Sequence, residues 1–262
     1  MGRVSLKELI EAGVHFGHRQ SRWNPKMERF IYGKRNAIHI IDLRQTVKGL
    51  VRGARFLKEV ASRGEQVLFV GTKRQARTTI ASEAQRAEMP YVSHRWLGGT
   101  LTNFQVIHSR LVRLKELEEM EASGELEALS KKEAASLRRE RMKILNNMEG
   151  IREMNRLPGA LFIIDPRREI IAVREANKME IPVVSFIDTD SDPDLITIPI
   201  PGNDDAMRAI QVVCGIIADA VIHGRTGKRP KKRAPKKPEE APSEEKAEEE
   251  KAEPEETVAA QE

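Results

Sequence analysis

Residues 66–87 read QVLFVGTKRQARTTIASEAQRA, and this stretch decides the fold class. Its first five residues form an apolar run with the length of one buried strand, and a helical pattern covers residues 75–87. The same order recurs along the chain, with predicted strands at 37–41, 66–70, 91–92, 160–164, 183–187 and 195–198, and predicted helices at 45–62, 75–87, 168–178 and 204–223. This alternation predicts an α/β fold with an open, doubly wound parallel sheet of the flavodoxin or Rossmann type, right-handed crossovers and helices on both faces.

One insertion interrupts the alternation. Residues 103–157 show no strand pattern, and their apolar residues recur at steps of three and four on either side of a break at Ser123 and Gly124. Ser130 and Glu133 have the spacing of a capping box, which starts a second helix. We therefore expect an antiparallel coiled-coil hairpin, inserted into an α/β domain formed by residues 1–102 and 158–224.

The last part of the chain has a different composition. Residues 225–237 hold eight lysines and arginines and no acidic residue, whereas residues 239–262 hold eleven glutamates. Such a segment buries too little apolar surface to offset the entropy lost on ordering. Residues 225–262 are therefore predicted to form a disordered charged tail. Its basic half is suited to RNA phosphates, and its acidic half would be repelled by them.

Composition limits the class of protein. Aromatic residues make up only 4 % of the 262 residues, which argues against a large apolar ligand pocket, and the net charge of +5 is compatible with a polyanionic partner. The single cysteine, Cys214, lies in an apolar run and is predicted to be a small core residue. The charged start of the chain does not resemble a signal peptide, and no apolar run approaches about 18 residues. We expect a cytoplasmic protein.

Known catalytic motifs of this fold are missing from the sequence. The segment Gly71-Thr72-Lys73-Arg74 follows a predicted strand but lacks the second glycine and the Lys-Ser/Thr pair of a phosphate-binding loop. Neither a dinucleotide fingerprint nor a Gly-x-Ser-x-Gly elbow is present. The best-known chemistries of this fold are therefore all missing together, which counts against an enzyme. Lys73 and Arg74 at a helix N-terminus nevertheless suggest a phosphate-binding site. The alternative is an ordinary helix N-terminus exposed to solvent.

The loop at residues 93–103 reads SHRWLGGTLTN and suggests RNA contact. Its two glycines permit close approach to another surface, while Arg95 and Trp96 offer a cation and a stacking plane. The alternative for Trp96 is that its ring anchors the loop in the core.

Residues 14–26 read VHFGHRQSRWNPK and combine two histidines with several cations. His15 and His18 could begin a metal site together with Asp188 or Asp190, but polar contacts are the more usual role of such a pair, and no metal or other cofactor is expected. The interleaved cations and tryptophan fit RNA contact better, and the candidates are Arg19, Arg22, Trp23 and Lys26.

The predicted hairpin carries many cations, but glutamates nearly balance them, as in a coiled coil with salt bridges between its helices. One local basic patch remains as a candidate for RNA contact, and it consists of Arg138, Arg139, Arg141 and Lys143.

These motifs together resemble the bacterial small-subunit ribosomal protein number two family. The similarity runs through LKELIEAGVHFGHRQSRWNPKMERFIYGKRNAIHIIDLRQT (residues 6–46), VLFVGTKRQA (67–76), YVSHRWLGGTLTNF (91–104), PGALFIIDPRREIIAVREANKMEIPVV (158–184) and FIDTDSDPDLITIPIPGNDDA (186–206). The segments follow the family's order, with the hairpin in the expected place. The tail after residue 224 is the main departure.

The resemblance implies a structural protein without catalytic residues. It implies binding to small-subunit ribosomal RNA between the head and body of the subunit, contacts with other small-subunit proteins, and help in docking the large first protein that captures messenger RNA. By matching position, it also implies RNA contact at Arg19, Arg22, Trp23, Asn24, Lys73, Arg74, Arg95 and Trp96.

Two other functions remain possible from the residues alone. One is a nucleotide-dependent enzyme that uses the switch point of the sheet, against which the missing phosphate motifs count. The other is a protein-docking module, in which the N-terminal segment or the hairpin holds partner proteins; this is compatible with RNA binding.

Overall fold

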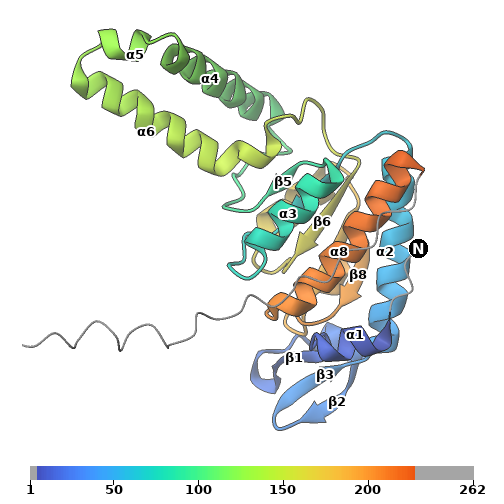
Figure 1. Cartoon of the computed structure of the whole chain (residues 1–262). Helices are drawn as coiled ribbons and strands as arrows, with labels where there is room; N and C mark the ends of the chain where they lie inside the picture. The colour runs from blue at the N-terminus through green and yellow to red at the C-terminus, as the bar shows by residue number, and fades with distance from the viewer. Residues whose placement is uncertain (1–4, 228–262) are drawn as a thin grey trace, which may run out of the picture. The chain divides into compact units, whose positions relative to one another are not determined.

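The computed structural model describes residues 5–227, so the predicted tail lies almost wholly outside the described residues. A parallel sheet of five strands forms its centre, in the order β5-β4-β6-β7-β8. Strands β5, β6 and β8 of this sheet are labelled in Figure 1. The strands are β4 (Val67–Val70), β5 (Tyr91–Val92), β6 (Ala160–Ile164), β7 (Val183–Ile187) and β8 (Ile198–Pro201). The predicted open parallel α/β sheet is thereby confirmed. The order reverses direction between β4 and β6, which creates the topological switch point of such folds.

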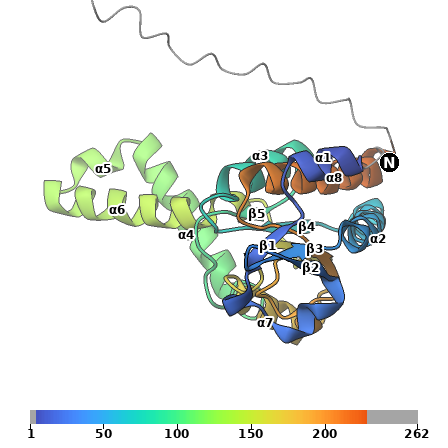
Figure 2. The same ribbon diagram turned by 90° about the horizontal axis from the view of Figure 1, so that it is seen from below.

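Helices cover both faces of this sheet. On one face lie α2 (Leu43–Ser62), α3 (Arg77–Ala87) and α8 (Met207–Thr226), and on the other lies α7 (Ile170–Lys178), as Figure 2 shows. Because side chains alternate along a strand, β4, β5, β6 and β7 each supply both cores, whereas the apolar side chains of β8 enter only the core under α8. Phe69 and Phe162 enter the core under α8, whereas Leu68 and Leu161 enter the core under α7.

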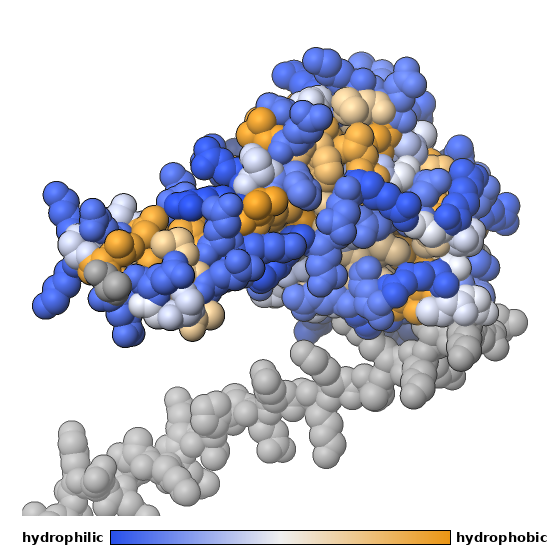
Figure 3. Space-filling view, turned by 90° about the horizontal axis from the view of Figure 1, so that it is seen from above, coloured by the Kyte–Doolittle hydropathy of each residue, from blue (hydrophilic) through white to orange (hydrophobic). Residues whose placement is uncertain are grey.

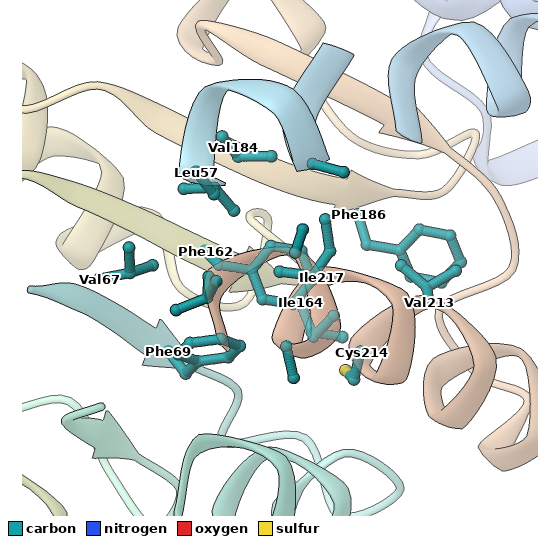
Figure 4. Close-up of a cluster of buried hydrophobic side chains, with 14 of the residues drawn as sticks. Leu57, Val67, Phe69, Phe162, Ile164, Val184, Phe186, Val213, Cys214 and Ile217 are labelled. Carbon is teal, nitrogen blue, oxygen red and sulfur yellow. The ribbon is translucent and has the colours of Figure 1, made fainter. Parts of the chain in front are cut away.

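The core under α8 is fully apolar at its centre (Figure 4). Leu57, Phe162 and Ile217 meet there from α2, β6 and α8, and each is 0 % exposed. Cys214 lies in the same cluster, also 0 % exposed, as the sequence predicts.

Helix α8 is long and apolar enough, by length and composition alone, to cross a membrane. The prediction that no run approaches this length is therefore wrong. Half of the helix's apolar window is buried, and α8 packs along α2 and α3. These contacts are those of a core helix.

The N-terminal region differs from its prediction. Residues 37–41 were expected to belong to the parallel sheet, but β3 (Ile38–Ile41) lies in a separate antiparallel sheet with β1 (Phe16–Arg19) and β2 (Ile31–Arg35), in the order β1-β3-β2. The cause is a tight turn: Asn36 and Ala37 have φ of 51° and 60°, which folds β2 straight back onto β3. Helix α1 (Leu6–Glu11) precedes this N-terminal sheet.

Two short 3₁₀ helices, η1 (Gln20–Arg22) and η2 (Pro25–Phe30), connect β1 to β2. A third, η4 (Pro193–Leu195), replaces the start of the strand predicted at 195–198, so that β8 begins only at Ile198. The prolines within β8 are tolerated because β8 is an edge strand. The helices α3, α7 and α8 each begin two or three residues later than predicted.

The insertion forms a hairpin of helices beyond β5 (Figure 1). It consists of α4 (Phe104–Ala122), the short α5 (Glu125–Ala128) and α6 (Lys131–Met148), followed by η3 (Glu149–Ile151). The predicted capping box is present, since the Ser130 side chain accepts from the backbone N–H of Glu133 and the Glu133 side chain accepts from that of Ser130. Ion pairs Arg113–Glu140, Arg141–Glu121 and Arg152–Glu118 tie the two arms together. Figure 3 shows hydrophilic residues over much of this hairpin, with apolar residues gathered along it.

Candidate nucleic-acid interface

Cations gather at one end of the N-terminal sheet. Ile38 in β3 pairs with Arg19 in β1 on one side and with Arg35 in β2 on the other. Residues paired directly across strands share a face, so the two arginines lie on the same face with one strand between them. Lys34 precedes Arg35, and Arg22 follows β1 in η1. We call Arg19, Arg22, Lys34 and Arg35 the N-terminal cation cluster.

The N-terminal cation cluster is free to meet an external anion. All four side chains are exposed, and none of them forms an ion pair with a carboxylate among residues 5–227. A short antiparallel sheet holds three of the four, so little backbone entropy is lost when they bind a partner. Cations presented in this way are suited to a phosphate backbone.

Trp23 and Asn24, which follow Arg22 in the chain, make contacts within the protein. The Trp23 ring is half-buried and lies 5.1 Å from the ring of His39, measured between centroids. The Asn24 side chain accepts from the backbone N–H of Lys26, and the Asn24 backbone N–H donates to the carbonyl of Thr189 at 2.7 Å. Asn24 therefore has a structural role in fixing the start of η2.

Lys26 is exposed but already paired. Its Nζ lies 2.8 Å from Asp192 and 2.9 Å from Asp194, and these hydrogen bonds raise the pKa of its ammonium. An RNA phosphate at Lys26 would have to compete with both carboxylates.

Lys73 does not form the phosphate-binding site that the sequence suggests. Lys73 is 8 % exposed, and its Nζ contacts Asp204 and Asp205 at 2.6 Å each and Asp165 at 3.3 Å. Burial opposes its charge, but the carboxylates of Asp204 and Asp205 outweigh burial and raise the pKa of Lys73. These carboxylates would repel a phosphate. Arg74, the next residue, is exposed and remains a candidate.

Glu175 on α7 organises the loop at 93–103. Its carboxylate accepts hydrogen bonds from Trp96 Nε1 at 3.2 Å and from the backbone N–H groups of Gly99 at 2.8 Å and Leu101 at 3.0 Å. Burial opposes ionisation of Glu175, but these donors together lower its pKa. Trp96 is 6 % exposed, so its ring anchors the loop and offers no stacking surface, as in the alternative reading of the sequence. Arg95, beside it, is exposed.

The basic patch expected on the hairpin is divided. Arg138 and Arg141 lie three residues apart on α6, and Arg139 and Lys143 lie four apart, so the four side chains form two pairs on different faces of the helix. Arg141 Nε contacts Glu121 on α4 at 2.9 Å. Arg138, Arg139 and Lys143 are exposed.

An acidic cluster lies at the carboxyl ends of the parallel strands. It consists of five carboxylates, which are Asp165, Asp188, Asp190, Asp204 and Asp205, and it faces His18 of β1. Burial raises the pKa of Asp188 to about 6 and also raises that of Asp204. The hydrogen bond to Asp190 raises the pKa of His18 to about 9.

The acidic cluster is partly paired within the protein. Burial opposes ionisation of Asp190, but hydrogen bonds from His18 and Arg167 lower its pKa to about 2. His15 does not belong to the cluster; its ring stacks beside Phe16, and its Nδ1 is buried without a hydrogen-bond partner.

Comparison with known proteins agrees with this architecture. The family model described as ribosomal protein S2 matches residues 9–224. The chain is 53 % identical over 225 residues, 86 % of each chain, to a protein of Rhodopirellula baltica named small ribosomal subunit protein uS2. The chain belongs to the ribosomal protein S2 family. It is therefore a ribosomal protein with a structural role in translation, in the cytoplasm, and not an enzyme.

Two cations of the N-terminal cation cluster in this S2 family member were not predicted as RNA contacts from the sequence. Lys34 and Arg35 lie inside the matching segment, but their charges alone did not single them out. The signal that could have found them is the Asn36-Ala37 turn, because a two-residue hairpin brings the preceding Arg35 across β3 from Arg19.

Proposed function

We propose that this S2 family member is built into the small ribosomal subunit by binding its ribosomal RNA, with the N-terminal cation cluster as the principal contact. The observation that carries this proposal is the set of four exposed cations, three of them on a short antiparallel sheet, that form no ion pair with a carboxylate among residues 5–227. Arg74 and Arg95 are secondary candidates, followed by Arg138, Arg139 and Lys143 on the hairpin. Lys73 and Trp96 are left out because they are buried.

Charge-removal variants test this proposal in reconstitution with small subunits that lack the protein. The test variant replaces Arg19, Arg22, Lys34 and Arg35 with alanine, and the matched control replaces four exposed hairpin cations that are not candidates, Arg110, Lys115, Lys131 and Lys132. Each lost phosphate contact reduces the slope of log affinity against log salt by roughly 0.7–0.9. We expect a slope reduced by about 3 in the test variant and a smaller change in the control. Equal effects in both variants would contradict a principal role for the N-terminal cation cluster.

The N-terminal helix supports a second role, docking of the large first protein of the subunit. Leu6 and Ile10 lie four residues apart on α1, hence on one face, and each is 53 % exposed. An apolar face of this kind is suited to a protein partner. A variant with Leu6→Gln and Ile10→Gln should enter subunits normally yet retain less of the first protein in sedimented subunits. Normal retention would contradict this role for α1.

A further inference from the structure

The acidic cluster carries more negative charge than its neighbours balance. Among the described residues, the cations in contact with its five carboxylates are Lys73, which meets three of them, and Arg167, which meets Asp190 at 2.7 Å. With all five carboxylates ionised, three negative charges remain, or two if His18 is protonated. Asp188 and Asp204 are 0 % and 1 % exposed, so water cannot solvate them well. Buried carboxylates of this kind are normally paired or bound to a metal ion.

Two carboxylate oxygens in the cluster lack a hydrogen-bond partner. They are Asp188 Oδ2 and Asp204 Oδ2, and both are buried. One ligand atom each from His18, Asp188 and Asp204 lie within 4.8 Å of one another. Each of the three residues therefore places one potential ligand atom near a common point, and two of them also have a buried oxygen without a hydrogen-bond partner.

We propose that His18, Asp188 and Asp204 bind one divalent metal ion of the Zn²⁺ class. One imidazole nitrogen with two carboxylate oxygens is a ligand set that suits Zn²⁺, whereas Mg²⁺ prefers oxygen alone. Asp205 Oδ2, 3.6 Å from His18 Nδ1, or a water molecule would complete four ligands. This site departs from the sequence-based expectation of no metal, and it uses one of the two histidines considered there.

The spacing of the ligand atoms is close to that of a bound site. Two ligands at about 2.0–2.1 Å from Zn²⁺ in tetrahedral geometry lie about 3.3 Å apart. His18 Nδ1 lies 3.9 Å from Asp188 Oδ2, and the three ligand atoms all lie within 4.8 Å of one another, so contractions of at most about 1.5 Å would form the site.

The surroundings of His18 also have the features of a metal ligand. Its other nitrogen, Nε2, lies 3.4 Å from Asp190 Oδ2, and a carboxylate on the far nitrogen commonly orients a metal-binding imidazole. Gly17 permits the close approach of this strand, since a Cβ there would lie 2.7 Å from Thr189 Cγ2 and 3.2 Å from Asp188 Oδ1.

The position of the site suggests what the metal does. Asp188 and Asp204 follow β7 and β8 of the parallel sheet, whereas His18 lies in β1 of the N-terminal sheet, next to Arg19 of the N-terminal cation cluster. A shared ion would fasten the N-terminal sheet to the parallel sheet. We therefore expect a structural metal, whose removal loosens β1 more than the rest of the chain.

Metal analysis of the purified full-length chain tests the site. The chain is dialysed with Zn²⁺, Mn²⁺ or Mg²⁺, and bound metal is then measured by mass spectrometry. The test variants are His18→Gln, Asp188→Asn and Asp204→Asn. The matched controls are the exposed His94→Gln and the partly exposed Asp219→Asn, and neither side chain forms a hydrogen bond or ion pair with the cluster among the described residues. We expect one Zn²⁺ per chain in the unaltered protein and the controls, and at least tenfold weaker binding in each test variant, by analogy with about 10–100-fold for lost second-shell partners.

A second set of measurements begins with the unaltered chain. Chelation by EDTA should lower the melting temperature of the Zn²⁺-loaded unaltered chain and increase amide exchange in β1. With Co²⁺ in place of Zn²⁺, the visible absorption of the bound ion should change in His18→Gln. Zn²⁺ binding that none of the three test variants weakens would overturn the proposal, as would preferential binding of Mg²⁺ or the absence of any stoichiometric metal.

Discussion

Replacement of Glu175 by glutamine should release the loop at 93–103 from the core. In the native chain, Oε1 accepts from Trp96 Nε1 and Gly99 N, while Oε2 accepts from the backbone N–H groups of Leu101 at 3.0 Å and Thr102 at 3.3 Å. A glutamine side chain has one oxygen and one NH₂ group. In either orientation of the amide, two of the four donors face another donor.

The expected cost follows from these four donors. Each buried donor left without an acceptor costs about 1–3 kcal/mol, and the two donors that keep an oxygen lose the stronger bond to a charged acceptor. Thr102 is half-exposed, so water can satisfy part of its loss. Glu175→Gln should therefore lower the free energy of unfolding by about 2–4 kcal/mol.

Urea unfolding followed by tryptophan fluorescence measures this loss, because Trp96 is one of only two tryptophans in the chain. The exposed Glu28→Gln is the matched control, expected within about 0.5 kcal/mol of the unaltered protein. Amide exchange at Gly99 and Leu101 should accelerate about 30-fold for a local loss of 2 kcal/mol. A loss below about 0.5 kcal/mol with unchanged exchange at these amides would refute the reasoning.

The pH dependence gives an independent check on the same carboxylate. The pKa of Glu175 is lowered in the folded protein, so its contribution to stability is fully present above the unfolded pKa, about 4.3, and is lost as the pH falls through the folded value. The stability difference between the unaltered protein and Glu175→Gln should shrink below about pH 4. A difference that stays constant down to pH 3 would contradict a charged Glu175 in the native loop.

Three further predictions concern backbone strain, close packing and buried charge. Ala37→Gly should raise the free energy of unfolding in urea by up to about 1 kcal/mol, because Ala37 has φ of 60° and glycine adopts this conformation without a Cβ penalty. A lower free energy of unfolding would contradict the left-handed conformation of Ala37 in the turn. Gly150→Ala should lower the melting temperature by several degrees, since the added Cβ would clash with the backbone and ring of Tyr91. A decrease of less than about 0.5 kcal/mol in the free energy of unfolding would show that the contact can relax. Lys73→Met should lower the free energy of unfolding in urea by about 3–5 kcal/mol, because Asp204 would lose its cation. An unchanged free energy of unfolding would mean that another cation compensates.

The parallel sheet could be predicted from the sequence because both of its faces are buried. Residues 67–70, 160–164 and 183–187 are buried at every position, so they appear in the sequence as continuous apolar runs. The N-terminal sheet gave no such pattern. None of the four residues of β1 is buried, and the strand is recognised only through its pairing with β3.

The candidate site was only partly predictable, for a related reason. The charge of Lys73 is visible in the sequence, but its partner Asp204 lies 131 residues further along the chain. Likewise, Trp96 contacts Glu175, which lies 79 residues downstream. Sequence spacing identifies cations and rings, whereas contacts across the fold decide which of them remain exposed.

The charges of this fold are separated, and this separation bears on where RNA is expected to bind. In open α/β sheets, ligands usually bind at the carboxyl ends of the strands. In this S2 family member those ends hold the acidic cluster, whose five carboxylates outnumber Lys73 and Arg167 and would repel phosphate. The N-terminal cation cluster lies instead on a sheet added before the parallel one in the chain. An enzyme-like sheet can thus serve as a scaffold, and the proposed RNA contact is expected outside its strand ends, on the N-terminal sheet.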